Sequence, residues 1–149
     1  MGMPAFGFLA AALLLAAASV AADDAAGMFK VVRGAVTVQR LGISLPAQAG
    51  MPVYPADRIV TGADGSAGIT FQDNTLLSLG PSSQFDLDRF SFNSTTHDGA
   101  FEATLDSGKL AVVSGKIAHH QQDAMKVRTP STVLGVRGTK FLVEVGGGS

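Results

Sequence analysis

Residues 136–145, Val-Arg-Gly-Thr-Lys-Phe-Leu-Val-Glu-Val, place an Arg-Gly pair directly before a run of alternating apolar residues. Residues 32–38, Val-Arg-Gly-Ala-Val-Thr-Val, have the same layout near the start of the chain. Glycine accepts the positive φ of a tight turn, and period-two alternation gives a strand one face for a core and one for water. Neither copy contains a nucleophile, paired carboxylates or a metal cluster. Two Arg-Gly turns framing β-rich sequence therefore favour a binding or scaffold module over an enzyme.

The sequence between the two copies alternates in the same way. Period-two runs predict strands at 67–71, 75–79, 84–90, 101–105, 110–113 and 125–128. Turn residues separate many of them, at 63–66, 72–74, 80–83 and 106–109. Residues 111–120 could be read as a helix, but Ser114-Gly115 interrupts the pattern and argues against one. We therefore expect an all-β fold of short antiparallel strands, either a twisted β-sandwich or a short β-solenoid-like roll.

The apolar residues of these runs that share one face form the predicted core. Successive side chains of a strand point to opposite faces, so every second residue is buried together. The predicted core residues are Val36, Val38, Ile59, Ile69, Phe71, Leu77, Leu79, Phe85, Leu87, Leu110, Val112, Phe141 and Val143.

Residues 1–22 have the pattern of a secretory signal peptide. An apolar stretch, Phe6–Ala18, precedes a small-x-small site at Ser19-Val20-Ala21, although no Lys or Arg stands before it. The alternative is an uncleaved anchor helix, but the run is short for a membrane span and rich in Ala. We expect cleavage after Ala21 or Ala22, one β domain at 23–149, a periplasmic or secreted location, and no stable membrane span.

Composition excludes several classes of function. The chain has 11 Lys and Arg against 12 Asp and Glu, one Tyr and no Trp. Nucleic-acid binding is excluded because there is neither a basic surplus nor a set of stacking aromatic residues. With no Cys, disulfides, zinc-thiolate sites and thiol catalysis are excluded as well.

Five segments in a fixed order carry a resemblance to a known family. They are Val32-Arg33-Gly34, residues 56–67 (ADRIVTGADGSA), residues 71–83 (FQDNTLLSLGPSS), Val127–Pro130 and Val136–Phe141. Over roughly residues 30–145 the chain resembles the FecR domain family. The resemblance implies an all-β domain of the bacterial envelope. Asn74 stands where the family usually has Gly, and Asn tolerates a left-handed backbone second best to Gly.

The family's namesakes relay the state of an outer-membrane transporter to a cytoplasmic sigma factor. That relay needs a cytoplasmic anti-sigma segment and a membrane-spanning helix, and this sequence shows neither. What the resemblance implies here is the periplasmic module, a sensory, scaffold or partner-binding domain. The sequence sets neither the partner nor the oligomeric state.

The Arg-Gly turns also supply the structural or binding candidates. Arg137, followed by Gly138 and Thr139, is expected under the loops, paired with a carboxylate. Asp57 is its natural partner, because it precedes an apolar strand. We predict an internal ion pair that fixes the strand register, with a ligand or partner contact as the alternative. Arg33 is the candidate counterpart in the first copy.

Metal and catalytic readings are weaker. Adjacent His119 and His120 point to opposite faces if they lie on a strand, so incidental surface histidines are expected. Asp86 and Asp88 share a strand face but lack the six to eight oxygen ligands that Ca²⁺ takes. No serine has the context of a nucleophile elbow, and no phosphate loop is present. We expect no catalytic, cofactor or metal site.

The function we expect is non-enzymatic: an envelope module that binds another envelope protein, for instance by pairing at an exposed sheet edge. One alternative is a carbohydrate module for cell-wall polymers, for which Tyr54 and a few Phe would have to serve as the platform. A hydrolase is the other alternative.

Overall fold

The computed structural model describes residues 25–121, 123–136 and 140–146. The proposed signal peptide lies outside the described residues. Twelve strands and one short helix follow in order: β1 Gly27–Arg33, β2 Val36–Arg40, β3 Ile43–Pro46, β4 Pro52–Val53, β5 Arg58–Thr61, β6 Ser66–Phe71, β7 Leu76–Leu79, β8 Gln84–Phe92, β9 Gly99–Val113, α1 Lys116–His120, β10 Met125–Arg128, β11 Val133–Gly135 and β12 Lys140–Val145. The all-β prediction is confirmed. None of the helices in this part of the chain is long and apolar enough to cross a bilayer.

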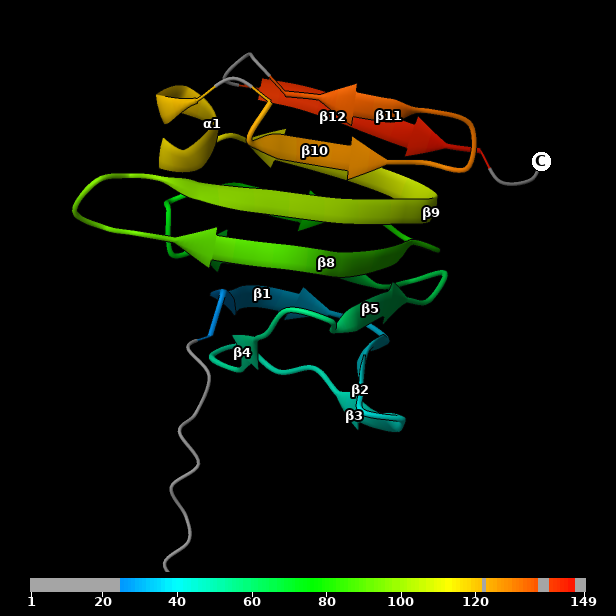
Figure 1. Cartoon of the computed structure of the whole chain (residues 1–149). Helices are drawn as coiled ribbons and strands as arrows, with labels where there is room; N and C mark the ends of the chain where they lie inside the picture. The colour runs from blue at the N-terminus through cyan, green and yellow to red at the C-terminus, as the bar shows by residue number, and fades with distance from the viewer. Residues whose placement is uncertain (1–24, 122, 137–139, 147–149) are drawn as a thin grey trace, which may run out of the picture.

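All twelve strands belong to one curled sheet, with strand order β3-β2-β5-β8-β9-β7-β6-β1-β4. β9 lies in the middle and is shared: its first part pairs with β8 and β10, and its last part pairs with β7 and β12. We call β3, β2, β5, β8, β10 and β11 the β8 half, and β4, β1, β6, β7 and β12 the β7 half. Figure 1 shows β8, β9 and β10 side by side, with β2 and β3 at the opposite end from β10, β11 and β12.

Four of the places where the chain passes between the two halves lie together. We call these places, residues 33–35, 62–65, 80–83 and 106–109, the sheet corner. The Gly62 N–H donates to the Ala35 carbonyl at 2.8 Å, and the Ser82 N–H donates to the Gly62 carbonyl at 3.0 Å. The Gly80 N–H donates to the Lys109 carbonyl at 3.0 Å. These hydrogen bonds satisfy backbone groups that the bend removes from the strand ladders.

The turns that the sequence predicted at 63–66 and 80–83 are therefore corners and not hairpins, because the strands they join do not pair with each other. The turn predicted at 106–109 is wrong as a strand end. β9 is one strand of 15 residues, Gly99–Val113, that runs through residues 106–109 without a break. Gly108 bends this strand with a φ of 96°. The prediction of antiparallel strands is wrong at one pair, since β10 runs parallel to β9.

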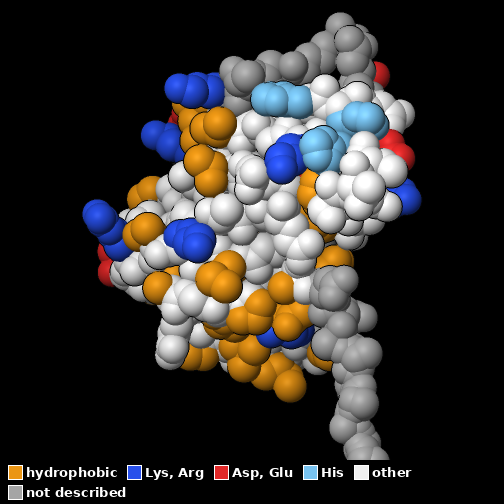
Figure 2. Space-filling model, turned by 90° about the vertical axis from the view of Figure 1, so that its left-hand side faces the viewer, with side chains coloured by type: hydrophobic (Ala, Val, Ile, Leu, Met, Phe, Trp, Pro, Cys, Tyr) orange, Lys and Arg blue, Asp and Glu red, His pale blue; other side chains and the backbone are white. Residues whose placement is uncertain are grey.

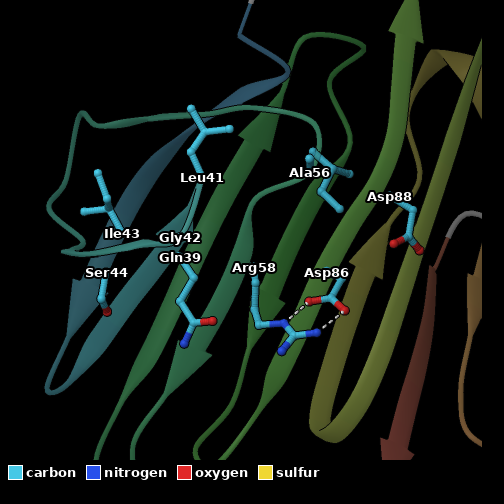
Figure 3. Close-up of a pocket in the computed structure, with 10 residues that line it drawn as sticks. Gln39, Leu41, Gly42, Ile43, Ser44, Ala56, Arg58, Asp86 and Asp88 are labelled. Carbon is cyan, nitrogen blue, oxygen red and sulfur yellow. Dashed lines mark hydrogen bonds and ion pairs between the residues drawn. The ribbon is translucent and has the colours of Figure 1, made fainter.

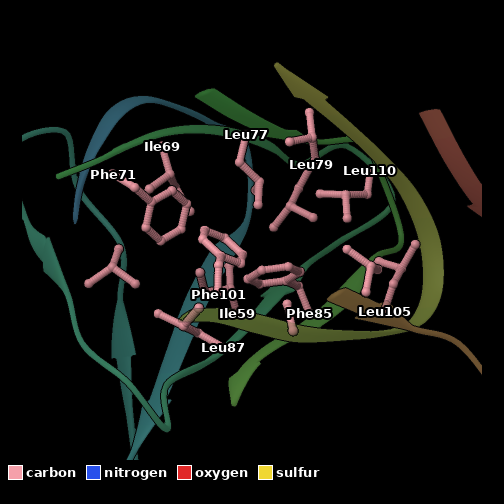
Figure 4. Packing of buried hydrophobic residues seen from close by; sticks show 14 of the residues in the cluster. Ile59, Ile69, Phe71, Leu77, Leu79, Phe85, Leu87, Phe101, Leu105 and Leu110 are labelled. Atoms are coloured by element: carbon pink, nitrogen blue, oxygen red, sulfur yellow. The ribbon is translucent and has the colours of Figure 1, made fainter. Parts of the chain in front are cut away.

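One hydrophobic core lies between the two halves. Figure 4 shows Phe71, Ile69 and Leu77 facing Phe85, Leu87 and Ile59 across it. Phe71 and Phe101 meet edge to face with ring centroids 4.8 Å apart, a favoured geometry for aromatic pairs. Of the predicted core residues, all are buried except Phe141, which is half-buried and packs against the cluster.

The β6–β7 turn supplies hydrogen-bond acceptors to the first N–H groups of α1. The buried Asp73 carboxylate accepts hydrogen bonds from the Thr75 N–H at 3.1 Å, the Thr75 hydroxyl at 2.8 Å and the Ile117 N–H at 3.2 Å. The Asp73 carbonyl accepts the Lys116 N–H at 2.8 Å. The first N–H groups of a helix have no intrahelical partner, so this turn supplies what the helix lacks.

Asn74, within that turn, has a φ of 71°, as the resemblance implied. Left-handed backbone costs less for Asn than for other residues with a Cβ and least for Gly. We expect Asn74→Gly to keep or raise the free energy of unfolding, by up to about 1 kcal/mol, and Asn74→Ala to lower it by about 1 kcal/mol. Urea unfolding of the two variants measures the difference. Equal midpoints for both would contradict a left-handed conformation at this position.

Candidate functional site

A bidentate ion pair joins Arg40, at the end of β2, to Asp57, just before β5. Nε and Nη2 of Arg40 donate to Oδ1 and Oδ2 of Asp57, each at 2.8 Å. The Tyr54 N–H donates to the same carboxylate at 2.8 Å, and Arg40 Nη2 donates to the Pro52 carbonyl at 3.2 Å. Asp57 is 1% exposed. The hydrogen bond to Asp57 raises the pKa of Arg40 above its ordinary value.

The structure gives Asp57 a partner that the sequence did not predict. Asp57 is buried in an ion pair, and its partner among the described residues is Arg40. Residues 137–139, which hold Arg137, Gly138 and Thr139, lie outside the described residues. Arg33 is exposed at the end of β1, within the sheet corner. The structure therefore brings none of the other candidates to Asp57 within its described ranges.

A groove of about 640 Å³ opens beside this ion pair, between the β2–β3 hairpin and strands β5 and β8. Figure 3 shows Leu41 and Ile43 on one side and the linked Arg58 and Asp86 on the other, with Asp88 beyond them. One wall is thus apolar and the other is charged. The lining residues are Gln39, Leu41, Gly42, Ile43, Ser44, Ala56, Arg58, Asp86, Leu87 and Asp88.

The apolar wall is the tip of the hairpin. Leu41 is 94% exposed and Ile43 is 59% exposed. Leu41 and Gly42 both have positive φ, 53° and 79°, as in the type I′ hairpin turn for which Asn-Gly is the favoured sequence. Leucine in this conformation costs roughly 1–2 kcal/mol. Its side chain contributes almost no burial in return, so the fold alone does not account for leucine at this position.

The charged wall is held in place by hydrogen bonds. Arg58 Nε donates to Asp86 Oδ1 at 2.7 Å and Nη2 donates to Oδ2 at 3.2 Å, and this bonding raises the pKa of Arg58. The Arg58 side chain is 44% exposed, so one edge of the guanidinium stays open to a ligand. Asp88 accepts a hydrogen bond from the Thr104 hydroxyl at 2.6 Å. Asp86 and Asp88 therefore have separate partners, and neither is placed with the other around a common ion.

The histidines gather at the opposite end of the molecule, as Figure 2 shows in pale blue. His120 Nε2 lies 3.0 Å from Asp98 Oδ1. The centroids of the His97 and His120 rings are 6.3 Å apart. His119 and His120 lie on α1, not on the strand considered for them in the sequence. Within residues 25–121, 123–136 and 140–146, no group of three or more His, Cys, Asp or Glu could hold a metal ion.

Figure 2 also shows hydrophobic side chains gathered at the lower end of that face, in the part of the molecule that carries β2, β3 and β4. Sequence reasoning missed the groove beside the β2–β3 hairpin. The signal available was Leu41-Gly42 between two alternating runs, a two-residue hairpin with Leu where Asn or Asp is usual.

Comparison with known proteins adds three findings. A family model described as "FecR protein" matches residues 57–149. A solved structure titled "Cell surface anchoring domain" is 32% identical, with a TM-score of 0.40, and the match covers 42% of this chain and 83% of that one. None of the curated proteins matches.

Proposed function

Since the chain belongs to the FecR protein family, we propose that it is a non-enzymatic protein-binding module of the bacterial envelope, with a sensory or scaffold role. The groove between the β2–β3 hairpin and strands β5 and β8, which we call the hairpin groove, is the surface through which it binds. The envelope location rests on the family and on the signal peptide that we predict at residues 1–22.

The observation that carries this proposal is Leu41. An apolar side chain that is 94% exposed on a left-handed turn residue is unfavourable for the isolated domain. Burial of such a side chain by a partner would recover about 25 cal/mol per Å² of apolar surface. Ile43 lies beside it, and the half-exposed Arg58 faces it across the groove, which suits a partner segment with apolar residues and a carboxylate or carbonyl.

The chemistry of the groove supports binding without catalysis. Ser44 is the only hydroxyl among the lining residues, which include no His or Cys. Asp86 is held in an ion pair by Arg58, which weakens a reading of Asp86 and Asp88 as a hydrolase acid/base pair.

The position of Tyr54 weakens the carbohydrate-binding alternative. The guanidinium carbon of Arg40 lies over the Tyr54 ring, 4.8 Å from its centroid. That face of the ring is therefore unavailable for stacking on a sugar.

Photo-crosslinking in cells of the source bacterium tests the proposal. A photoreactive residue at Leu41 is expected to give one discrete protein adduct. Adding Ile43→Asp is expected to reduce its yield at least tenfold, because the partner's apolar contact is lost. The same residue at Thr95, exposed in the loop at the far end of the molecule, is the control and should give no such adduct. No adduct at Leu41, or one indifferent to Ile43→Asp, contradicts the proposal.

Leu41→Asn separates binding from folding. Asn accepts the left-handed backbone, so the free energy of unfolding should stay the same or rise by up to about 1 kcal/mol, while partner binding falls. Thermal unfolding and competition for the crosslinked partner measure the two effects. A variant that loses stability together with binding would indicate that Leu41 supports the fold.

A further inference from the structure

Four strands form the edges of the curled sheet: β3, β4, β11 and β12 each pair with a single described strand. Three of them have features that discourage pairing with another chain. β3 is four residues long and ends in Pro46, β4 is two residues long and begins with Pro52, and β11 is three residues long. Natural proteins blunt free edges in these ways, with short strands and with proline.

β12 has none of these features. It is six residues long, lacks proline, and pairs with β9 in an unbroken register from Lys140↔Val113 to Val145↔Gly108. A regular edge of this length offers a row of backbone N–H and C=O groups to a further strand. Among the described strands, β12 is therefore the edge best able to accept one.

The outward side chains of β12 are Lys140, Leu142 and Glu144, all of them exposed. Leu142 is 69% exposed and lies at the centre of these three residues. The positively charged Lys140 stands two residues before it, and the negatively charged Glu144 stands two residues after it. The sequence Lys-x-Leu-x-Glu is therefore complementary to itself when read in the opposite direction, which is the requirement of an antiparallel two-fold contact.

We propose that β12 pairs antiparallel with β12 of a second copy of this chain, about a two-fold axis at Leu142. In this register Leu142 faces the partner's Leu142, and Lys140 faces the partner's Glu144. The β7 halves of the two copies then form one continuous sheet. The contact lies away from the hairpin groove, so it does not depend on the proposed function.

The charges around β12 favour this register over its neighbours. Glu144 already lies beside Lys109 within one copy, 4.0 Å away, whereas the neighbour of Lys140 across the strand pair is the apolar Val113. The proposed pairing gives Lys140 a carboxylate and sets each Glu144 between two lysines. An axis at Lys140 or at Glu144 would instead place like charges opposite each other, which is unfavourable.

Engineered cysteines test the register directly, because the chain has no cysteine of its own. Leu142→Cys in the full exported chain is expected to form a disulfide-linked dimer under mild oxidation, since facing Cβ atoms lie about 5 Å apart. Lys140→Cys alone should not, because its two copies are offset by four residues, roughly 14 Å. Mixing Lys140→Cys with Glu144→Cys should restore the crosslink.

Charge reversal tests the same contact without a covalent bond. In analytical ultracentrifugation, Lys140→Glu and Glu144→Lys should each raise the dimer dissociation constant at least tenfold. An equimolar mixture of the two should dimerise to within about threefold of the unmodified chain, because every facing pair then has opposite signs. Lys30→Glu, an equal charge change at an exposed position on β1, is the control and should have no effect.

The outcomes decide for or against the proposal. A chain that stays monomeric up to the highest soluble concentration overturns it, and so does a dimer that neither crosslinks through Leu142→Cys nor responds to the charge variants. Thermal unfolding of each variant checks that the fold is retained, and because these side chains are exposed, changes within about 0.5 kcal/mol are expected. Loss of dimerisation with retained folding supports the strand contact.

Discussion

Replacing Gly108 with alanine is expected to lower the free energy of unfolding by more than about 3 kcal/mol. Gly108 has a φ of 96°, a conformation that residues with a Cβ adopt at a cost of roughly 1–3 kcal/mol. A Cβ there would lie 2.0 Å from Ser83 Oγ and 2.4 Å from Ser83 Cα. Overpacking of a close contact adds typically 1–3 kcal/mol, so the two costs together exceed either alone.

The clash at Gly108 falls on the hydrogen bonds of the sheet corner. Ser83 is 1% exposed, its hydroxyl donates to the Gly80 carbonyl at 2.8 Å, and it accepts the Lys109 N–H at 3.0 Å. Moving Ser83 to make room for a methyl group would leave buried polar groups without partners. We therefore expect the corner to lose hydrogen bonds as well as packing.

Gly50→Ala is the matched control, measured by urea unfolding beside Gly108→Ala. Gly50 has a φ of 91°, but nothing lies within 4 Å of a Cβ built there. It should therefore show only the backbone cost, roughly 1–3 kcal/mol, and lose less than Gly108→Ala. Adding Ser83→Gly to Gly108→Ala should not rescue stability, because the Ser83 Cα remains in the way. Equal losses at Gly50 and Gly108 would show that the close contact plays no part.

The alternation of apolar residues was enough to predict the fold class. Ile69 and Phe71, for example, are buried because a strand with one face on a core must repeat with a period of two. Turn residues were also placed correctly at 63–66 and 80–83. What local sequence cannot express is whether two strands joined by a turn pair with each other, because pairing depends on the whole sheet. For that reason the sequence predicted these turns without showing that they join strands of different halves, and the bend at Gly108 was taken as the end of a strand.

The site was harder to predict for a related reason. Asp57 was singled out because it precedes an apolar strand, but its partner is determined by which strand lies beside β5. The β2–β5 register sets Gln39 opposite Arg58, so Arg40 and Asp57 are the next residues to meet. Nothing in the local pattern of residues 36–40 reveals that neighbour. Likewise, the groove arises from the approach of the β2–β3 hairpin to β5 and β8, which are distant in sequence.

Replacing Arg40 with methionine is expected to lower the free energy of unfolding by about 3–5 kcal/mol, because it leaves the buried Asp57 carboxylate without its counter-charge. Asp57 is 1% exposed, and only the Tyr54 N–H would still donate to it. Asp57→Asn should cost less, about 1–3 kcal/mol, since Arg40 is 24% exposed and can turn toward water. Urea unfolding of both variants measures this asymmetry. Equal losses would show that burial of Asp57 is not what determines the cost.

The Arg58–Asp86 pair provides the comparison that isolates burial. It has the same bidentate geometry, with hydrogen bonds of 2.7 Å and 3.2 Å. The side chain of Arg58 is 44% exposed, however, and that of Asp86 is 21% exposed. Arg58→Met should therefore cost no more than about 1 kcal/mol, and this cost should shrink further in high salt. The loss from Arg40→Met should change little with salt, because a buried pair is poorly screened. If both substitutions cost the same and respond alike to salt, then Arg40 and Asp57 act as a surface pair and do not fix the register of β2 against β5.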